Sequence, residues 1–380
     1  MVVRAWMPAF AGMTGSNHAV TPAKAGSRAV EATRSVASFK LALLGFGNVG
    51  RAFARLLLRK REELQRAYGI EWRVVAIAAR RAGAAISDAG LDLERAVAAV
   101  EGGGSLASLS DRPPPSAMDE IIRASGAEVL FENTPVNYET GQPALDHLVA
   151  GLEAGMHVIT ANKGPVVHGY RRLRELARKR GRHFFFESAV MDGAPIFSMW
   201  RTALPGARLE SFRGVLNSTT NLILTLMESG QTFDEAVAQA QTIGVAETDP
   251  SGDILGWDAA VKVAALVTVL MDHPLLPGDV ERQGIEGITP NLVREVREQG
   301  RRWKLVCQAK RTPDGVVARV GPEQVGPEDP LHGVLGTSSS ITFVSDVLGN
   351  LTVIEDNPGP ETTAYGLLAD FINAVRTPVD

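Results

Sequence analysis

The stretch LALLGFGNVGRAFARLLL, residues 41–58, decides the fold class. A short apolar run ends at Gly45, and apolar side chains then follow at helical spacing from Val49 onward. This order of strand, glycine-rich turn and helix is what a dinucleotide-binding fingerprint requires. Gly45 permits the tight turn, Gly47 lets the backbone approach a pyrophosphate, and Gly50 lets the helix pack against the strand. The residues expected to contact the cofactor are therefore Gly45, Phe46, Gly47, Asn48, Val49 and Gly50.

The second predicted strand, WRVVAIAARR at residues 72–81, ends in two arginines. Sites specific for NAD usually place an acidic side chain at this position, where it binds the ribose hydroxyls. A planar guanidinium group instead matches the 2′-phosphate of NADP. Arg80 and Arg81 therefore favour NADP, with NAD as the alternative if both are ordinary solvated arginines.

Strands and helices alternate from residue 40 to about residue 165. This rhythm predicts an α/β domain with a doubly wound, parallel sheet of the Rossmann type. Two of its strand-like runs have polar ends. Thr134 lies at the end of the run AEVLFENTPVN, and Lys163 lies at the end of the run HVITANKGPV. Ligands bind at the carboxyl ends of such strands, so both residues are candidates for binding cofactor or substrate. The alternative for Lys163 is an ordinary loop lysine.

The pattern changes after residue 165, where strands and helices no longer alternate regularly. We therefore expect a cofactor-binding domain at residues 40–165 and a second, α+β domain with a mixed sheet at residues 166–335. Residues 336–380 end in a helix whose apolar spacing suits docking on a sheet, and we expect this segment to return to the first domain. Residues 1–39 carry glycine, proline, alanine and serine without lasting periodicity, which predicts a disordered extension.

The composition excludes several classes of protein. A chain of 380 residues is long enough for two domains, and a net charge of −4 without a basic stripe argues against nucleic-acid binding. No run of about 18 apolar residues occurs, so no membrane span is expected. The single cysteine, Cys307, excludes an intrachain disulfide framework and is typical of a reducing compartment such as the cytoplasm.

The run GVAETDPSGDILGWDAAVKVAAL, residues 244–266, joins an acidic loop to an apolar helix. Asp258 and Lys262 are four residues apart, so their side chains share one face of that helix. Glu247 and Asp253 lie in the preceding loop. A lysine held by an aspartate can donate a proton to a carbonyl oxygen while a nearby group binds an amine. The alternative is a solvated ion pair, worth only about 0.3–0.5 kcal/mol.

A polar loop, Asn217 to Asn221, lies between a predicted strand and a predicted helix in the run FRGVLNSTTNLILTLM, residues 212–227. Its hydroxyl groups, its amides and the helix N-terminus suit a substrate carboxylate, and Thr219 stands at its centre. The alternative is that the loop only caps the helix, through Thr220 or Asn221.

Several of these runs together resemble the signature of homoserine dehydrogenases. The resemblance extends over residues 40–380 and is carried by residues 41–50, VITANKGP, FFFESAVMDGAPIF and the long run at residues 214–266. It implies the reduction of L-aspartate 4-semialdehyde to L-homoserine with NAD(P)H, in the biosynthesis of threonine, methionine and isoleucine. It also implies a homodimer, with the substrate and the dimer contacts in the second domain. A dehydrogenase of a related amino-acid substrate and a catalytically silent NADP-binding sensor remain as alternatives.

The resemblance assigns roles residue by residue. Lys262 matches the proton donor, and Asp258 matches the aspartate that orients this lysine and the substrate. The expected substrate-binding residues are Glu247, which would bind the amino group, Thr219, Asp253 and Lys163, the last of which also matches a cofactor contact. The residues whose carbonyls would hold a monovalent cation such as Na⁺ are Glu187, Val190, Asp192 and Ala194.

Three features depart from the usual pattern of this family. The glycine-rich run before the last helix reads EDNPGPETTA here, which leaves only Gly359 for a cofactor contact. Asp192 stands where a small residue is commoner. The chain ends just after the closing helix, so we expect no C-terminal regulatory domain of the ACT type and no threonine feedback through such a domain.

Overall fold

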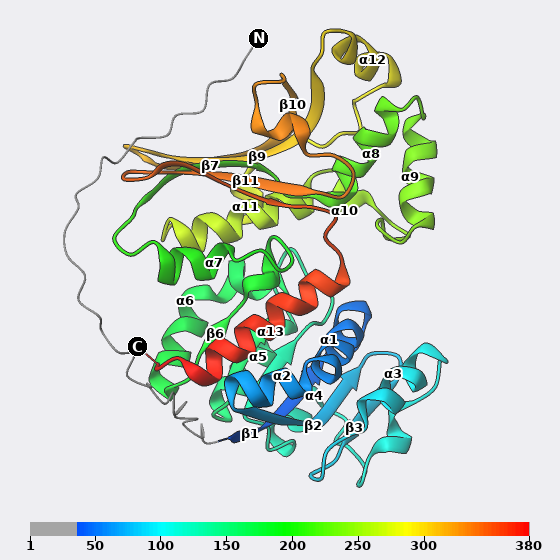
Figure 1. Cartoon of the computed structure of the whole chain (residues 1–380), viewed down its shortest axis with the longest axis vertical. Coiled ribbons are helices and arrows are strands. Elements are labelled where there is room, and N and C mark those ends of the chain that lie inside the picture. The colour runs from blue at the N-terminus through cyan, green and yellow to red at the C-terminus, as the bar shows by residue number, and fades with distance from the viewer. Residues whose placement is uncertain (1–35, 380) are drawn as a thin grey trace, which may run out of the picture. The chain divides into compact units, whose positions relative to one another are not determined.

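The computed structural model describes residues 36–379, which contain two six-stranded β-sheets. Each sheet is the centre of one lobe, here called the parallel-sheet lobe and the mixed-sheet lobe (Figure 1). The expected extension at residues 1–39 falls outside the described residues as far as residue 35, whereas strand β1 already begins at Ala37. No helix within residues 36–379 has the length and apolarity needed to span a membrane.

The parallel-sheet lobe has the strand order β3-β2-β1-β4-β5-β6. Adjacent strands are parallel, except that β3 forms an antiparallel hairpin with β2. The expected Rossmann-type sheet is therefore confirmed, with an antiparallel edge strand added. Its strands are β1 Ala37–Leu44, β2 Ile70–Ala79, β3 Gly83–Ile86, β4 Val129–Glu132, β5 His157–Thr160 and β6 Phe184–Phe185. Its helices are α1 Asn48–Arg59, α2 Arg61–Glu63, α3 Leu93–Glu101, α4 Met118–Ala124, α5 Ala144–Glu153, α6 Lys163–Arg180 and α13 Pro360–Arg376.

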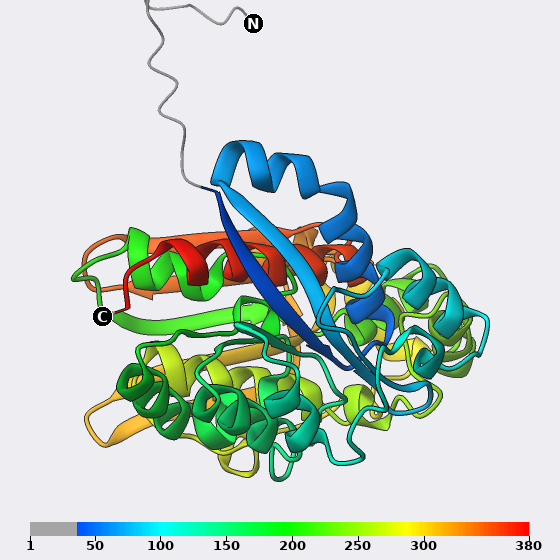
Figure 2. The same ribbon diagram turned by 90° about the horizontal axis from the view of Figure 1, so that it is seen from below.

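Strand β1 is apolar throughout its second half because both of its faces are covered. Leu41 and Leu43 belong to the core that contains α1 and α13, whereas Ala42 and Leu44 belong to the core that contains α5 and α6. Figure 2 shows α13 in red and α1 in blue above the sheet that contains β1, and most of the green helices below it. Helices on both faces are the hallmark of a doubly wound sheet.

Helix α13 is a structural part of the parallel-sheet lobe although it comes last in the chain. Its residues Leu367 and Phe371 are fully buried in the same core as α1. The ring of Phe371 lies 5.9 Å from that of Phe131 in β4, and Phe131 in turn lies 4.5 Å from Phe53 in α1. The helix therefore closes one face of the first sheet.

The mixed-sheet lobe has the strand order β12-β11-β7-β9-β10-β8. Neighbours are antiparallel except β8, which is parallel to β10, so the mixed sheet expected from the sequence is confirmed. Helix α11 packs on one face of this sheet, in a common core with Leu305 and Cys307 of β9. The strands are β7 Leu209–Val215, β8 Glu281–Arg282, β9 Arg302–Thr312, β10 Gly315–Val325, β11 Ser339–Ser345 and β12 Gly349–Glu355. The remaining helices are α7 Ile196–Ser198, α8 Ser218–Glu228, α9 Phe233–Thr242, α10 Ser251–Ile254, α11 Trp257–Leu270 and α12 Pro290–Glu298.

The lobe boundaries differ from those expected. Strand β6 pairs with β5, so the parallel-sheet lobe continues through α6 and β6 and does not end at residue 165. Strands β11 and β12 belong to the mixed sheet, so only α13 of the segment 336–380 returns to the first lobe. Local periodicity identifies a strand, but the choice of sheet depends on partners that are distant in sequence.

Candidate active site

The turn between β1 and α1 requires glycine at two positions. Gly45 has a φ of +83°, and a Cβ there would lie 2.2 Å from the carbonyl oxygen of Asn133. A Cβ on Gly50 would lie 2.4 Å from the carbonyl oxygen of Gly45. Gly47 faces open space instead, with no atom within 4 Å of its Cβ position. Because α1 also lacks a side-chain cap at its N-terminus, the turn leaves room for a phosphate beside its uncapped N–H groups.

The other residues of the turn have different surroundings. Phe46 is 1% exposed and packs in the core, so only its backbone borders the turn. Asn48 is exposed and accepts a hydrogen bond from Arg51. Val49 lines a cavity that both lobes border. The turn therefore offers a ligand mainly its backbone.

Arg80 and Arg81 lie in the hairpin that joins β2 to β3, at the carboxyl end of β2. Both are exposed, and neither forms an ion pair with another residue of the segment 36–379. Their guanidinium groups are therefore accessible to an anion from solution.

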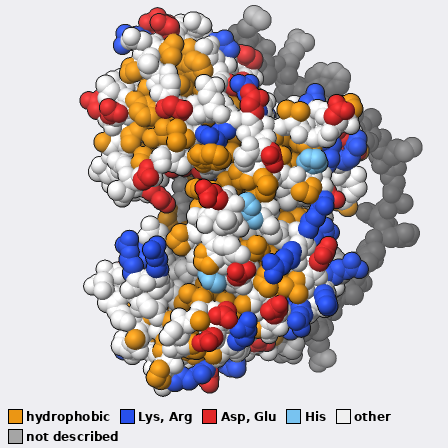
Figure 3. Space-filling view, turned by 180° about the vertical axis from the view of Figure 1, so that it is seen from behind, with side chains coloured by type: hydrophobic (Ala, Val, Ile, Leu, Met, Phe, Trp, Pro, Cys, Tyr) orange, Lys and Arg blue, Asp and Glu red, His pale blue; other side chains and the backbone are white. Residues whose placement is uncertain are grey.

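A cavity of about 260 Å³ is lined by both lobes. It begins at the glycine-rich turn and the carboxyl ends of β4 and β5, and it reaches α11 of the mixed-sheet lobe. Figure 3 shows one side of the molecule hollowed between the lobes, with acidic side chains on one border and basic side chains on the other. The residues predicted from the sequence that line the cavity are Val49, Thr134, Lys163, Val190, Asp192 and Lys262.

Asp258 is the centre of a charged cluster at this cavity. Its carboxylate accepts hydrogen bonds from Lys163 Nζ at 2.6 Å and from Asn217 Nδ2 at 3.0 Å, and it lies 3.3 Å from Lys262 Nζ. Lys262 Nζ also donates to the carbonyl oxygen of Leu216 at 2.6 Å. The side chains of all three charged residues are largely buried. The solvated ion pair considered above is therefore excluded.

The two lysines determine the charge state of this cluster. Burial opposes the ionisation of Asp258, but the charges of Lys163 and Lys262 outweigh it and hold the pKa of Asp258 well below its usual range. Burial likewise opposes the charge on Lys163, and Asp258 outweighs it, so the pKa of Lys163 is raised. The cluster thus contains one carboxylate and a charged Lys163 at neutral pH.

Lys163 owes its position to the start of helix α6. In the strand-like run HVITANKGPV the strand ends at Thr160, and the helix begins at Lys163. Asn162 Oδ1 accepts a hydrogen bond from the N–H of Gly164 at 3.0 Å, which caps the helix. This cap places the lysine at the carboxyl edge of the sheet.

Asn217 links the polar loop to the carboxylates of Asp253 and Asp258. The sequence did not identify it as a candidate site residue. Its Nδ2 donates to Asp253 at 2.6 Å as well as to Asp258, while its Oδ1 accepts from the N–H of Thr220 at 2.8 Å. Asn217 is therefore the N-cap of α8, whereas the alternative drawn from the sequence placed the cap at Thr220 or Asn221. Burial and the charge of Asp258 raise the pKa of Asp253.

The remaining substrate candidates lie in or beside the acidic loop between α9 and α10. Thr219 is buried, and its hydroxyl donates to the carbonyl oxygen of Val245 at 3.3 Å. Glu247 is exposed, and its carboxylate forms no ion pair within residues 36–379. Gly359 lies apart from them at the N-cap of α13, where its N–H donates to Thr362, and it does not line the cavity.

The segment from Glu187 to Ala194 runs beside the cavity. The Glu187 carboxylate accepts hydrogen bonds from the N–H groups of Phe197 and Ser198 at 2.6 and 2.8 Å, so it caps α7. The Ala194 carbonyl accepts from an N–H two residues later at 2.8 Å. No group of three or more His, Cys, Asp or Glu side chains suited to a metal ion occurs in the described part of the chain.

Asp192 lies in the same segment with a φ of +41° and accepts a hydrogen bond from the Thr363 hydroxyl at 2.5 Å. Glu355, at the end of β12, lies near it. Burial, followed by the charge of Asp192, raises the pKa of Glu355 to about 7. This chain therefore places two carboxyl groups together at the point where β12 leads to α13.

Glu132 is a second residue that the sequence interpretation missed. It is fully buried at the end of β4 and accepts hydrogen bonds from the N–H of Thr134 at 3.0 Å and from the hydroxyl of Thr160 at 3.2 Å. These bonds fix the loops that follow β4 and β5. An acid at the end of an otherwise apolar strand, as in VLFE, was the available signal.

Comparisons with known proteins cover both lobes. The family model described as homoserine dehydrogenase, NAD binding domain, matches residues 45–187, and the model described as homoserine dehydrogenase matches residues 195–372. A homoserine dehydrogenase of Methanocaldococcus jannaschii is 37% identical over 332 residues, which are 87% of this chain and 97% of the relative. An NAD(+)-dependent homoserine dehydrogenase of Pseudomonas canavaninivorans is 34% identical over 336 residues, which are 88% of this chain and 96% of the relative.

A solved structure gives the same result for the fold. A hyperthermophilic archaeal homoserine dehydrogenase in complex with NADPH superimposes with a TM-score of 0.75 at 29% identity, over 90% of this chain and 100% of that chain. The matches span both sheets and the helix that carries Asp258 and Lys262. The chain therefore belongs to the homoserine dehydrogenase family, whose members are NAD(P)-dependent oxidoreductases.

Proposed function

We propose that the cavity is the site where the aldehyde group of L-aspartate 4-semialdehyde is reduced to the alcohol of L-homoserine with NAD(P)H. The observation that carries this proposal is the position of Lys262. Its ammonium group lines the same cavity as Val49 of the glycine-rich turn, so a proton donor and a seat for the cofactor border one space. Membership of the family supports the choice of substrate.

In this proposal Lys262 protonates the oxygen of the substrate carbonyl as negative charge develops there. The Leu216 carbonyl and the Asp258 carboxylate hold its ammonium group in place, so the donor is oriented before the reaction. A donor positioned in this way usually accelerates a reaction by roughly 10²–10⁴-fold. When bound, the cofactor supplies the hydride to the aldehyde carbon.

The amino and carboxylate groups of the substrate would be bound by residues from both lobes, next to the charged cluster around Asp258. We assign its ammonium group to the carboxylates of Glu247 and Asp253, which form no ion pair within the described residues. Lys163 lines the cavity at the carboxyl edge of the first sheet and is available to cofactor and substrate alike. Thr219 would act mainly through Val245, by holding the acidic loop in position.

The direct test is an assay of NADPH oxidation with aspartate semialdehyde, repeated with NADH. We expect turnover with at least one of the two cofactors and L-homoserine as the product. A purified, folded protein that oxidises neither cofactor in the presence of the semialdehyde would overturn the proposal.

The cofactor preference follows from the hairpin after β2. Both cofactor types occur among the relatives, since one is named as NAD(+)-dependent and another was solved with NADPH. We propose NADP for this chain because Arg80 and Arg81 are exposed and unpaired within residues 36–379, at the strand end where a ribose substituent would lie.

Replacing Arg80 and Arg81 together by alanine should raise the KM for NADPH about tenfold or more and leave the KM for NADH nearly unchanged. The reason is that only NADPH carries the 2′-phosphate, and a charge-assisted hydrogen bond is worth about 1.5–3 kcal/mol. The measurement is a pair of steady-state titrations on the variant and the parent protein. Equal changes for both cofactors would show that neither arginine binds that phosphate.

A monovalent cation such as Na⁺ remains a proposal for the segment from Glu187 to Ala194. The donors there are backbone carbonyls, which suit a hard monovalent ion. The Ala194 carbonyl already accepts one N–H group. Val190 and Asp192 line the cavity and are the more accessible members of the set.

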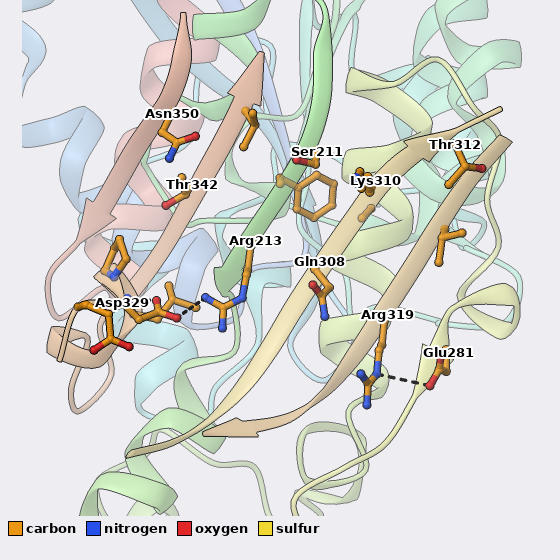
Figure 4. Close-up of a pocket in the computed structure, with 17 residues that line it drawn as sticks. Ser211, Arg213, Glu281, Gln308, Lys310, Thr312, Arg319, Asp329, Thr342 and Asn350 are labelled. Carbon is orange, nitrogen blue, oxygen red and sulfur yellow. Dashed lines mark hydrogen bonds and ion pairs between the residues drawn. The ribbon is translucent and has the colours of Figure 1, made fainter. Parts of the chain in front are cut away.

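We also propose that the protein is a homodimer. The face of the mixed sheet that does not contact α11 carries a hollow of about 830 Å³, whose walls are Arg213, Gln308 and Lys310 among others (Figure 4). Val317, at the same hollow, is 59% exposed. An uncovered sheet face that exposes an apolar side chain such as Val317 favours association with a second copy, because twofold symmetry pairs like surfaces.

Sedimentation of the purified protein should therefore give twice the mass of one chain. Val317→Glu should shift the protein towards the monomer, because a carboxylate buried at a symmetric interface faces its own copy. A parent protein that sediments as a monomer at micromolar concentration would refute the proposed dimer.

A further inference from the structure

Tyr138 belongs to a loop that is held rigidly beside the start of α6. Asn137 Oδ1 accepts hydrogen bonds from the N–H groups of Glu139 and Thr140, each at 3.0 Å. The carbonyl oxygen of Tyr138 lies 2.9 Å from His168 Nε2. The loop packs so closely on α6 that a Cβ on Gly141 would lie 2.9 Å from the backbone of α6. The position of the tyrosine is therefore set by the parallel-sheet lobe.

The side chain of Tyr138 reaches helix α10 of the other lobe, which directly follows the acidic loop. A Cβ on Gly252 would lie 3.6 Å from Cε2 and 3.9 Å from the hydroxyl oxygen of the tyrosine. The ring is half-buried and packs against the main core. Its hydroxyl group has no hydrogen-bond partner within residues 36–379. The hydroxyl oxygen itself is not fully buried, so it is accessible to a hydrogen-bond partner that enters from solution.

Most of the charges that act on this hydroxyl group are negative. Burial, followed by the charges of Asp258, Asp253 and Glu247, raises the pKa of Tyr138 against the opposing charge of Lys262, so the phenol stays neutral. Asp258 is balanced by two lysines, whereas Asp253 and Glu247 form no ion pair within the described residues. The space next to the tyrosine is therefore attractive to a cation.

We propose that Tyr138 forms one wall of the binding site for the substrate's α-ammonium group, with its hydroxyl oxygen accepting a hydrogen bond from that group. The inference rests on the proposed function, which assigns the ammonium group to Glu247 and Asp253. The neutral phenol accepts one N–H of the ammonium group and can donate its own proton to a neighbouring carboxylate. Tyr138 thereby selects aldehydes that carry an amino group, and it does so from the lobe that holds the cofactor.

The test is Tyr138→Phe, which keeps the ring and its packing and removes only the hydroxyl group. We expect the KM for aspartate semialdehyde to rise about tenfold, because a hydrogen bond to a charged group is worth about 1.5–3 kcal/mol. The KM for the cofactor and kcat should change less than about twofold, since the hydroxyl group contacts neither the cofactor nor the reacting carbonyl.

Two inhibitors separate binding of the ammonium group from a merely structural effect. L-Homoserine carries the amino group and 4-hydroxybutanoate lacks it, so only the inhibition constant of L-homoserine should rise in the variant, by about tenfold. A matched control is Tyr170→Phe, which removes another half-buried phenol that packs on Phe186, away from the acidic loop. This control should leave every constant unchanged.

The inference fails if Tyr138→Phe retains the parent KM for the semialdehyde, or if both inhibitors weaken equally. Failure of the proposed function has a different signature, because the parent protein itself would then not turn over the semialdehyde.

Discussion

Lys262→Ala is expected to lower kcat by two orders of magnitude or more while the protein stays folded. A positioned proton donor usually contributes roughly 10²–10⁴-fold, and it acts only as charge develops on the carbonyl oxygen. The KM for the cofactor should be nearly unchanged, because the lysine is assigned to the substrate carbonyl, whereas the phosphates of the cofactor are assigned to the glycine-rich turn. Asp258 retains Lys163 as a partner at 2.6 Å, so the variant does not leave an unpaired buried carboxylate.

The measurement combines steady-state kinetics with a thermal melt and a cofactor titration. Lys179→Ala, a change of an exposed lysine on α6, is the control for loss of charge alone and should have parent activity. Turnover near that of the parent protein in Lys262→Ala would refute the assignment of the proton donor.

Asp258→Asn should affect both stability and activity. The buried carboxylate balances Lys163 and Lys262, and its removal leaves two ammonium groups close together in a partly buried site. Removing one partner of a buried ion pair typically costs about 3–5 kcal/mol in the free energy of unfolding. We also expect kcat to fall by about two orders of magnitude, because the proton donor loses the group that orients it.

The stability effect has a defined dependence on pH. The pKa of Asp258 is lower in the folded protein than in the unfolded chain, so its contribution is complete above the ordinary carboxyl value of about 3.9. This contribution to stability is lost as the pH falls through the lower pKa that Asp258 has in the folded protein. Denaturant unfolding of parent and variant should therefore differ by a constant amount from pH 5 to pH 8, and the difference should shrink at pH 3.

Asp249→Asn is the matched control for this variant. Asp249 is an exposed acid in the same loop, where its carboxylate accepts the N–H of Ser251 at 3.1 Å. Its replacement should change stability little at any pH. An Asp258→Asn protein as stable and as active as this control would contradict the structural role of the charged cluster.

The sequence predicted those parts of the site that depend on neighbours in the chain. The spacing of Gly45, Gly47 and Gly50 is a property of one turn, and the pairing of Asp258 with Lys262 is a property of one helix. Residues of this kind can be found from local pattern because the same few residues supply both the motif and its geometry.

The sequence did not predict the contacts that depend on folding. Lys163 and Asp258 are 95 residues apart, and their bond exists only because the two lobes meet at the cavity. Asn217 was read as part of a polar loop for a substrate carboxylate, with capping by Thr220 or Asn221 as the alternative, and its bonds to Asp253 and Asp258 have no local signal. The same limit applies to the lobe boundaries, because β11 and β12 join a sheet whose other strands are distant in sequence.

The placement of α13 has a consequence for synthesis on the ribosome. The first sheet is complete once β6 has been made, but the helix that covers Phe131 and Phe53 on one of its faces is made only after the whole mixed-sheet lobe. At about 5–20 residues per second the interval is on the order of ten seconds or more. A first lobe that folds within this interval would present an apolar groove where Leu367 and Phe371 later pack. The nascent chain must therefore either wait in a partly folded state or be shielded by a chaperone until its last helix emerges.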